Sequence, residues 1–127
     1  ELQKSGFFDG IDIIVPLPLS RKKLRKRGYN QCDYIAQGLS EVTGIAVCNS
    51  CIERIIDTDT QTRKGRIERW ENTKNIFRIT NAGVLTGKHI LLIDDVVTTG
   101  ATLHACISAM LATTSVRISV FTLTKAV

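Results

Sequence analysis

The fold is decided by the stretch Ile90-Leu91-Leu92-Ile93-Asp94-Asp95-Val96-Val97-Thr98-Thr99-Gly100-Ala101-Thr102. It begins with a short apolar run without alternation, which is typical of a strand buried on both faces in a parallel sheet covered by helices. In open α/β sheets, ligands gather beyond the carboxyl ends of such strands. We therefore predict that this strand ends at Asp94 and Asp95, and that a ligand site lies there.

The residues after the two carboxylates are suited to binding a phosphate group. Backbone amides where a helix begins, together with threonine hydroxyls, form a binding place for one phosphate, and Gly100 lets the backbone approach it closely. The predicted phosphate-binding residues are Thr98, Thr99, Gly100, Ala101 and Thr102. Asp94 and Asp95 could accept hydrogen bonds from the vicinal hydroxyls of a ribose. Because adjacent strand residues point to opposite faces, both can meet one ligand only if the chain bends.

Two other interpretations of this stretch were weighed. A nucleoside triphosphatase is excluded, because the segment from Gly83 to His89 has one residue too few between its glycines and lacks Ser or Thr after Lys88. A solvated acidic turn followed by a threonine cap is the structural alternative. The buried strand that precedes the carboxylates favours a ligand site, and a ribose 5-phosphate fits it best.

The chain before this stretch contains strand and helix signals. We predict a strand over Gly10–Val15, stopped by Pro16 and Pro18, and strand pieces over Ile45–Val47 and Cys51–Ile56. Between them, a helix is expected over Asn30–Val42 and ends near Gly44. Its buried face is expected to comprise Tyr34, Ile35, Leu39 and Val42.

The chain after Ile56 alternates between polar and apolar segments. The long polar stretch Asp57–Asn75 is expected to be a mobile lid. A helix over Thr102–Ala112 and a strand over Val116–Leu123 follow the central strand, and the helix is expected to bury Leu103, Cys106, Ile107, Met110 and Leu111. The order of elements predicts an α/β fold with a mostly parallel, twisted sheet flanked by helices. A chain of 127 residues has room for one such domain.

Charge is concentrated in one segment. The chain has 17 basic and 12 acidic residues, a net charge of +5, and six of the seven residues Arg21–Arg27 are basic. Without this heptad 11 basic residues face 12 acidic ones, a charge of −1. A uniformly basic coat for nucleic acid is therefore excluded. The heptad fits a discrete polyanion, a small nucleic-acid patch or a solvated basic surface.

Cysteines, histidines and apolar runs point to an ordinary cytoplasmic protein. Four cysteines at irregular spacings favour free thiols over a disulfide framework, although Cys48 and Cys51 have a spacing used for metal binding. Whether this pair binds anything is left open. His89 and His104 are expected to be structural, His89 at a strand edge and His104 in a helix. The longest apolar runs are too short to span a membrane, and no signal peptide is visible.

The motifs together resemble a known family. The stretch Asp94–Thr102 is similar to the signature with which type I phosphoribosyltransferases bind 5-phosphoribosyl-1-pyrophosphate (PRPP). Elements spread from Asp12 to Leu123 resemble the ComF/GntX group, relatives of competence protein F. They are Val15–Ser20, Arg27–Gln31, Arg54 with Thr58 and Gln61, Glu68-Arg69, Asn72 and Phe77. Members usually carry an N-terminal zinc ribbon. Residues 1–127 are therefore expected to be one phosphoribosyltransferase-like domain, a C-terminal fragment.

The resemblance implies roles for individual residues. Asp94 and Asp95 would hold the ribose hydroxyls and, through the substrate, Mg²⁺ as cofactor, while residues 98–102 would hold the 5-phosphate. The pyrophosphate would lie near Pro18, Leu19, Ser20 and Arg21. Residues 57–75 would form the hood, which includes Arg69 and Asn72, and Arg69 would add positive charge at the pyrophosphate.

The implied activity is transfer of the phosphoribosyl group to a nitrogen acceptor with release of pyrophosphate. The alternative is a non-catalytic protein that senses PRPP or nucleotides, or that binds single-stranded DNA through Lys22, Lys23, Arg25 and Lys26 during DNA uptake. The motifs leave the acceptor, the turnover and the oligomeric state open.

Overall fold

The computed structural model describes residues 8–55, 76–97 and 101–125, and residues 95–97 and 123–125 by their backbone alone. The lid prediction for Asp57–Asn75 therefore lies outside the described residues. The described elements follow the predicted order with additions. They are β1 (Ile13–Pro16), α1 (Arg21–Arg27), α2 (Gln31–Thr43), β2 (Ala46–Val47), β3 (Ile52–Arg54), β4 (Phe77–Ile79), α4 (Ala82–Leu85), β5 (His89–Val97), α5 (Ala101–Thr113) and β6 (Arg117–Lys125).

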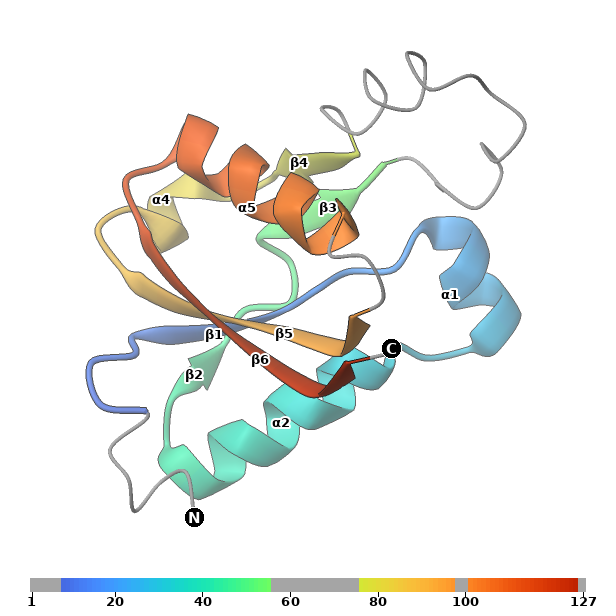
Figure 1. Ribbon diagram of the computed structural model, residues 1–127, viewed down its shortest axis with the longest axis horizontal. Helices are drawn as coiled ribbons and strands as arrows, with labels where there is room; N and C mark the ends of the chain where they lie inside the picture. Colours follow the sequence, from blue (N-terminus) through green and yellow to red (C-terminus); the bar gives the residue numbers. More distant parts are fainter. Residues whose placement is uncertain (1–7, 56–75, 98–100, 126–127) are drawn as a thin grey trace.

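A four-stranded parallel sheet in the order β2-β1-β5-β6 forms the centre of the molecule (Figure 1). The predicted apolar strand, β5, lies in the interior of this sheet between β1 and β6. Its residues Ile90, Leu91, Leu92 and Ile93 are fully buried. We predicted that this strand ends at Asp94 and Asp95, but it does not. β5 continues to Val97 because β6 is equally long and pairs with it as far as Lys125.

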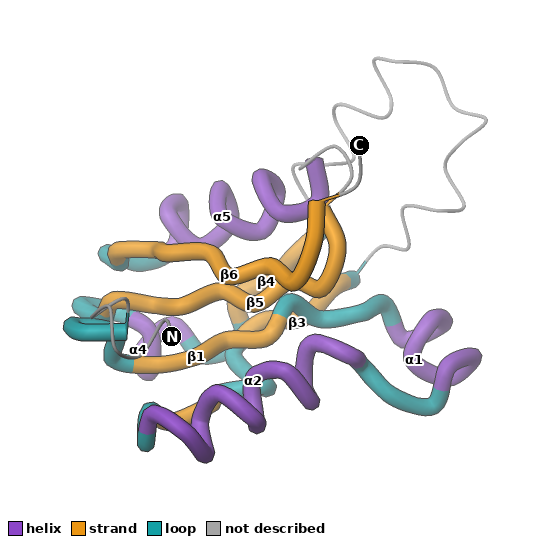
Figure 2. Tube along the Cα trace, turned by 60° about the horizontal axis from the view of Figure 1, so that its bottom comes forward, coloured by secondary structure: helices purple, strands orange, loops and turns teal. Residues whose placement is uncertain are grey.

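Helices cover the sheet on both faces, as the continuous apolar strand requires. α2 lies against one face, and α5 lies against the other together with the short antiparallel pair β3–β4 (Figure 2). The core between these layers contains Ile14 and Val15 of β1, Leu85 of α4 and Met110 of α5. The predicted α/β class with a mostly parallel sheet is confirmed, whereas the β3–β4 pairing was not predicted.

The helix α2 begins and ends one residue later than predicted, and both its ends carry capping residues. The Asn30 side chain accepts a hydrogen bond from the Cys32 amide, and Gly44 closes the helix in the left-handed conformation, with φ of 77°. Its buried face was predicted only in part: Tyr34 is 66% exposed and Val42 62% exposed. The face against the sheet comprises Cys32, Ile35, Ala36 and Leu39, where small side chains allow close approach.

The helix α1 was not predicted, because no apolar residues recur along Arg21–Arg27. Its ends are nevertheless well defined. The Ser20 hydroxyl accepts a hydrogen bond from the Lys23 amide, and Gly28 ends the helix with φ of 83°. None of its residues is buried. The basic heptad is therefore a capped surface helix.

The helix α5 is one residue longer at each end than the predicted helix Thr102–Ala112. Cys106 and Met110 are buried and Leu103 and Ile107 are partly buried, as predicted. Leu111 is 56% exposed, which corrects its assignment to the core; Ala105 is buried instead. Within the residues that the structure describes, no helix combines the length and the apolar character needed to cross a membrane.

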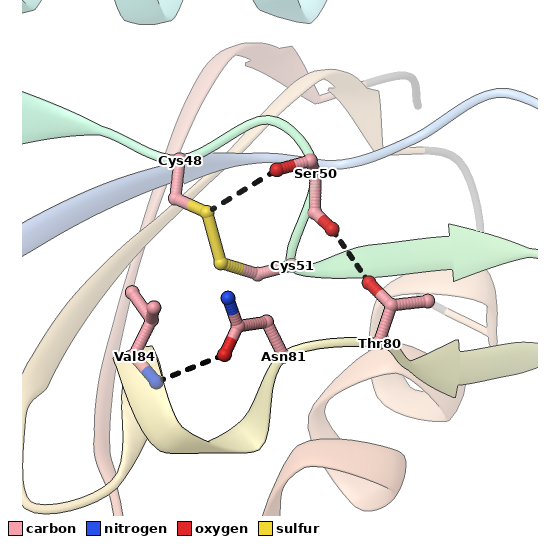
Figure 3. Close-up of a disulfide and its surroundings, with 6 residues drawn as sticks. All are labelled: Cys48, Ser50, Cys51, Thr80, Asn81 and Val84. Carbon is pink, nitrogen blue, oxygen red and sulfur yellow. Dashed lines mark hydrogen bonds between the residues drawn. A yellow bond between two sulfur atoms is a disulfide. The ribbon is translucent and has the colours of Figure 1, made fainter.

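The prediction of free thiols is wrong for one pair. Cys48 and Cys51 form a disulfide in the turn that connects β2 to β3 (Figure 3). The turn brings their Cα atoms to 6.0 Å, within the range that a disulfide spans. Around it, the Thr80 hydroxyl donates to the Ser50 carbonyl and the Thr80 amide to the Cys51 carbonyl. Cys32 and Cys106 are free and buried.

Candidate functional site

The chain leaves the sheet in opposite directions at the boundary between β1 and β5. From β1 it passes through α2 to β2 on one side, and from β5 through α5 to β6 on the other (Figure 1). In doubly wound sheets, ligands bind at the carboxyl ends of the strands at such a switch point. The site is therefore expected beyond the ends of β1 and β5, which is where the predicted ligand-binding segments begin.

The register of the two strands brings these distant segments together. Pro16 pairs with Ile93, and the Leu17 amide donates to the Ile93 carbonyl at 2.8 Å. The segment Pro18–Arg21 therefore leaves the sheet directly beside Asp94, although more than half of the sequence lies between them. The structure thus places the predicted pyrophosphate segment next to one of the predicted carboxylates.

Asp94 is buried, with 9% of its surface exposed, and lies opposite Thr122 of β6. It acts electrostatically on Cys106 of α5. Burial raises the pKa of this thiol to about 12, Asp94 adds to the increase, and Arg54 opposes it. Asp94 and the buried Arg54 of β3 therefore both lie within electrostatic range of one thiol, on the face that α5 covers. Asp95 lies within β5, and its side chain is outside the described part.

The segment after β1 is fixed by its neighbours. Asn30 is buried, and its amide nitrogen donates to the Leu17 carbonyl at 3.0 Å while its oxygen caps α2. Ser20 is also buried and caps α1. Pro18 and Leu19, which lie between Leu17 and Ser20, are partly exposed. One asparagine thus connects the predicted pyrophosphate segment to the start of the helix that packs under the sheet.

The motif Arg27–Gln31 has a structural explanation in this geometry. Arg27 ends α1, Gly28 reverses the chain, and Asn30 begins α2. The rings of Tyr29 and Tyr34 meet edge to face with centroids 5.7 Å apart. Tyr29 precedes the cap and Tyr34 is the fourth helical residue, which is the position pair of a hydrophobic staple. The ring contact of Tyr29 with Tyr34 therefore helps to fix the start of α2.

A cleft of about 380 Å³ opens between the β1–α1 segment and the β3–β4 pair. It is lined by Ser20, Arg21, Lys22, Glu53, Arg54, Ile55 and Arg78. The family resemblance pointed to Ser20, Arg21 and Arg54, but not to Glu53 or Arg78. These two residues become neighbours through the pairing of β3 with β4, in which Glu53 lies opposite Arg78.

Other predicted site residues are only partly described. Ala101 and Thr102 form the first turn of α5, Ala101 exposed and Thr102 half-buried. Thr98, Thr99 and Gly100 lie outside the described residues, as do Arg69 and Asn72. His89 is the first residue of β5, and its Nε2 lies 2.8 Å from the Ser119 hydroxyl oxygen. In the described ranges, no group of three or more His, Cys, Asp or Glu side chains could hold a metal ion.

The architecture defines an α/β protein of the type I phosphoribosyltransferase fold. It is similar to a crystal structure of adenine phosphoribosyltransferase, with a TM-score of 0.61 over 98% of this chain and 63% of that chain at 14% identity. The adenine phosphoribosyltransferase of Saccharomyces cerevisiae gives a TM-score of 0.60 at 13% identity, covering 98% and 62% of the two chains. At these identities the similarity establishes the fold alone.

Sequence similarity establishes the family. The family model of the phosphoribosyl transferase domain matches residues 35–125, and the chain belongs to this family. It is 35% identical over 94 residues to competence protein F of Haemophilus influenzae, covering 73% of this chain and 41% of that protein. It is 36% identical over 91 residues to the DNA utilization protein YhgH of Escherichia coli, covering 72% and 39%.

The Bacillus subtilis competence protein ComFC is 34% identical over 92 residues, covering 72% of this chain and 35% of that protein. The resemblance to competence protein F relatives is therefore confirmed. The matched residues correspond to between 35% and 41% of the length of these three relatives.

Proposed function

We propose that this protein binds PRPP at the carboxyl ends of β1 and β5, and that it transfers the phosphoribosyl group to a nitrogen acceptor. The observation that supports the proposal is the β1–β5 register, which sets Leu17 beside Ile93. The segment of the predicted pyrophosphate site and the carboxylates of the predicted ribose site begin from adjacent positions there. A ligand that carries a diphosphate on one side of a ribose matches this arrangement.

In this proposal each group of residues binds a different part of PRPP. Asp94 and Asp95 accept hydrogen bonds from the ribose hydroxyls, and residues 98–102 hold the 5-phosphate. Pro18, Leu19, Ser20 and Arg21 surround the pyrophosphate, and Arg69 would add positive charge to this site. The bond from ribose C1 to the pyrophosphate oxygen breaks, and a bond from C1 to the acceptor nitrogen forms. Fixed positive charge near the departing pyrophosphate lowers the barrier, by about 3 kcal/mol for one such contact.

The described residues are compatible with Mg²⁺ as a cofactor bound together with substrate. This ion usually takes one or two carboxylates and completes its coordination with substrate phosphates and water. Asp94 and the adjacent Asp95 of β5 provide such carboxylates at the carboxyl end of the sheet, where the ligand is expected. When bound, Mg²⁺ would neutralise negative charge that develops on the leaving pyrophosphate.

Calorimetry with PRPP and Mg²⁺ tests the proposal. In the double variant Asp94→Asn and Asp95→Asn, we expect affinity to fall at least about tenfold, because two charge-assisted hydrogen bonds to the ribose are weakened. The matched control is Asp9→Asn with Glu41→Gln, which removes two exposed carboxylates elsewhere. Undiminished binding by a folded double variant, checked by circular dichroism, would contradict the proposal.

A second candidate function is single-stranded DNA binding through α1. The helix exposes Lys22, Arg25, Lys26 and Arg27 and buries none of its residues. Contacts between such cations and phosphates weaken steeply with salt, because binding releases counterions. If α1 binds DNA, neutralising Lys22, Lys23, Arg25 and Lys26 to Gln will reduce both affinity and salt dependence. Binding to an oligonucleotide that is insensitive to salt and to these changes would exclude this function.

A further inference from the structure

The cleft beside the predicted pyrophosphate segment contains an unequal set of charges. Among the described residues that line it, four are cationic, Arg21, Lys22, Arg54 and Arg78, and one is a carboxylate, Glu53. A concentration of like charge in a confined space favours binding of a multivalent anion. The carboxylate in the middle of these cations therefore has a specific position relative to any ligand that enters.

Glu53 uses both of its oxygens to pair with cations from two different parts of the molecule. Its Oε1 accepts from Arg21 Nη2 of α1 at 3.1 Å, and its Oε2 accepts from Arg78 Nη2 of β4 at 2.5 Å. The hydrogen bond from Arg78 is the main cause that lowers the pKa of Glu53, and the charge and hydrogen bond of Arg21 contribute. Glu53 is thus ionised at neutral pH and bridges the two cations.

Arg21 and Arg78, in their ion pairs with Glu53, are held less firmly than the guanidinium group of Arg54. The side chains of Arg21 and Arg78 are 83% and 62% exposed, whereas that of Glu53 is 26% exposed. Exposed ion pairs contribute little free energy and are easily exchanged for another partner. Arg54, in contrast, is buried with its guanidinium carbon 5.8 Å from the centre of the Phe77 ring. Among the three arginines of the cleft, Arg54 is therefore fixed by burial, whereas Arg21 and Arg78 can change partners.

We propose that Glu53 is an internal counter-ion that occupies the anion site, and that a ligand with a diphosphate group displaces it from Arg21 and Arg78. A diphosphate can offer oxygens to both guanidinium groups at once, in place of the two carboxylate oxygens. A single phosphate can also span the two guanidinium groups, but it carries less negative charge and so compensates less well for the displaced carboxylate. Glu53 therefore favours diphosphates over monophosphates. The inference rests on the proposed function, which places pyrophosphate near Ser20 and Arg21, and it adds Glu53 and Arg78 as specificity-determining residues.

Titration with inorganic pyrophosphate and, separately, inorganic phosphate tests this role by calorimetry. We expect Glu53→Gln to bind pyrophosphate roughly three- to tenfold more tightly, as expected for the removal of a competing partner from two exposed ion pairs. We also expect its preference for pyrophosphate over phosphate to shrink. Glu41→Gln on the exposed side of α2 makes the same change in net charge, and should alter affinity by less than about twofold.

Two further variants keep the test decisive. Glu53→Asp retains the charge with a shorter reach, so its affinity should fall between those of the parent protein and Glu53→Gln. Arg78→Gln should weaken pyrophosphate binding, whereas Arg117→Gln, which removes an exposed arginine at the start of β6, should not. Unchanged or weaker binding by Glu53→Gln, or no pyrophosphate binding by any of these proteins, would overturn the inference.

The outcome is separable from that of the proposed function. If Glu53→Gln binds pyrophosphate more tightly while the double variant of Asp94 and Asp95 binds PRPP as tightly as the parent protein, the cleft is an anion site without the proposed ribose site. If PRPP binding depends on the two carboxylates while Glu53→Gln has no effect on pyrophosphate, the proposed function stands and the counter-ion role of Glu53 is wrong.

Discussion

Two helices follow β1 in direct succession, and they are held in place by different means. α2 buries Cys32 and Ala36 against the sheet, so the hydrophobic core fixes its position. α1 buries no residue, and its described anchors are the cap of Ser20, the turn at Gly28 and the ion pair of Arg21 with Glu53. The difference indicates that α2 supports the site, whereas the side chains of α1 can carry charge and change partners at little cost in stability.

The largest test of this comparison concerns the buried face of α2. Ala36 is fully buried, so Ala36→Asp places a carboxylate in the core and should destabilise the protein by more than about 3 kcal/mol. Gln37→Asp introduces the same side chain at the exposed neighbouring position and should change stability by less than about 1 kcal/mol. Chemical unfolding measures both. Equal effects of the two variants would show that α2 does not depend on the core.

A smaller effect is expected where α2 joins the ligand edge. Asn30→Ala removes the cap of α2 and the hydrogen bond to the buried Leu17 carbonyl, and should cost about 1 to 3 kcal/mol. The control is Asn81→Ala, since Asn81 caps the short helix α4 at an exposed position and makes one such contact. We expect the control to cost less than Asn30→Ala in urea unfolding. A larger cost for Asn81→Ala would contradict the role assigned to Asn30.

The smallest effect on stability is expected from the charges of α1. Changing Lys22, Arg25 and Lys26 to Gln replaces exposed side chains in a helix without buried residues, so each change should alter the unfolding free energy by no more than about 0.5 kcal/mol. The same urea titration provides the measurement. A loss as large as that of Asn30→Ala would mean that α1 is fixed by its charges as well as by its ends.

The two helices also show which sequence signals were informative. The bounds of α2 were predictable because Asn30 and Gly44 flank an apolar pattern. The apolar residues of this pattern lie on two neighbouring faces of the helix, however, one exposed and one buried. Tyr34 and Val42 belong to the exposed one, and the small residues Cys32 and Ala36 were overlooked although they lie against the sheet. α1 lacked any apolar pattern, and only Ser20 and Gly28, both capping residues, indicated its ends.

The candidate site was predictable to a similar extent. Asp94 was identified from the residues themselves, because an apolar strand followed by carboxylates is a local pattern, whereas the segment Pro18–Arg21 was identified through the family resemblance. Glu53 and Arg78 were not identified, since each lies in a three-residue strand and has no local signal of function. The disulfide of Cys48 with Cys51 was also missed, because spacing alone does not distinguish a disulfide from free thiols.

The sequence by itself determined the order of strands and helices, the buried centre of β5, the ends of α2 and the concentration of charge in Arg21–Arg27. These are properties of neighbouring residues, and local sterics and periodicity express them. Only the tertiary structure decided that Leu17 lies beside Ile93, and that Glu53 lies opposite Arg78 and within reach of Arg21. Such contacts depend on strand order and register, which are set by packing of the whole core.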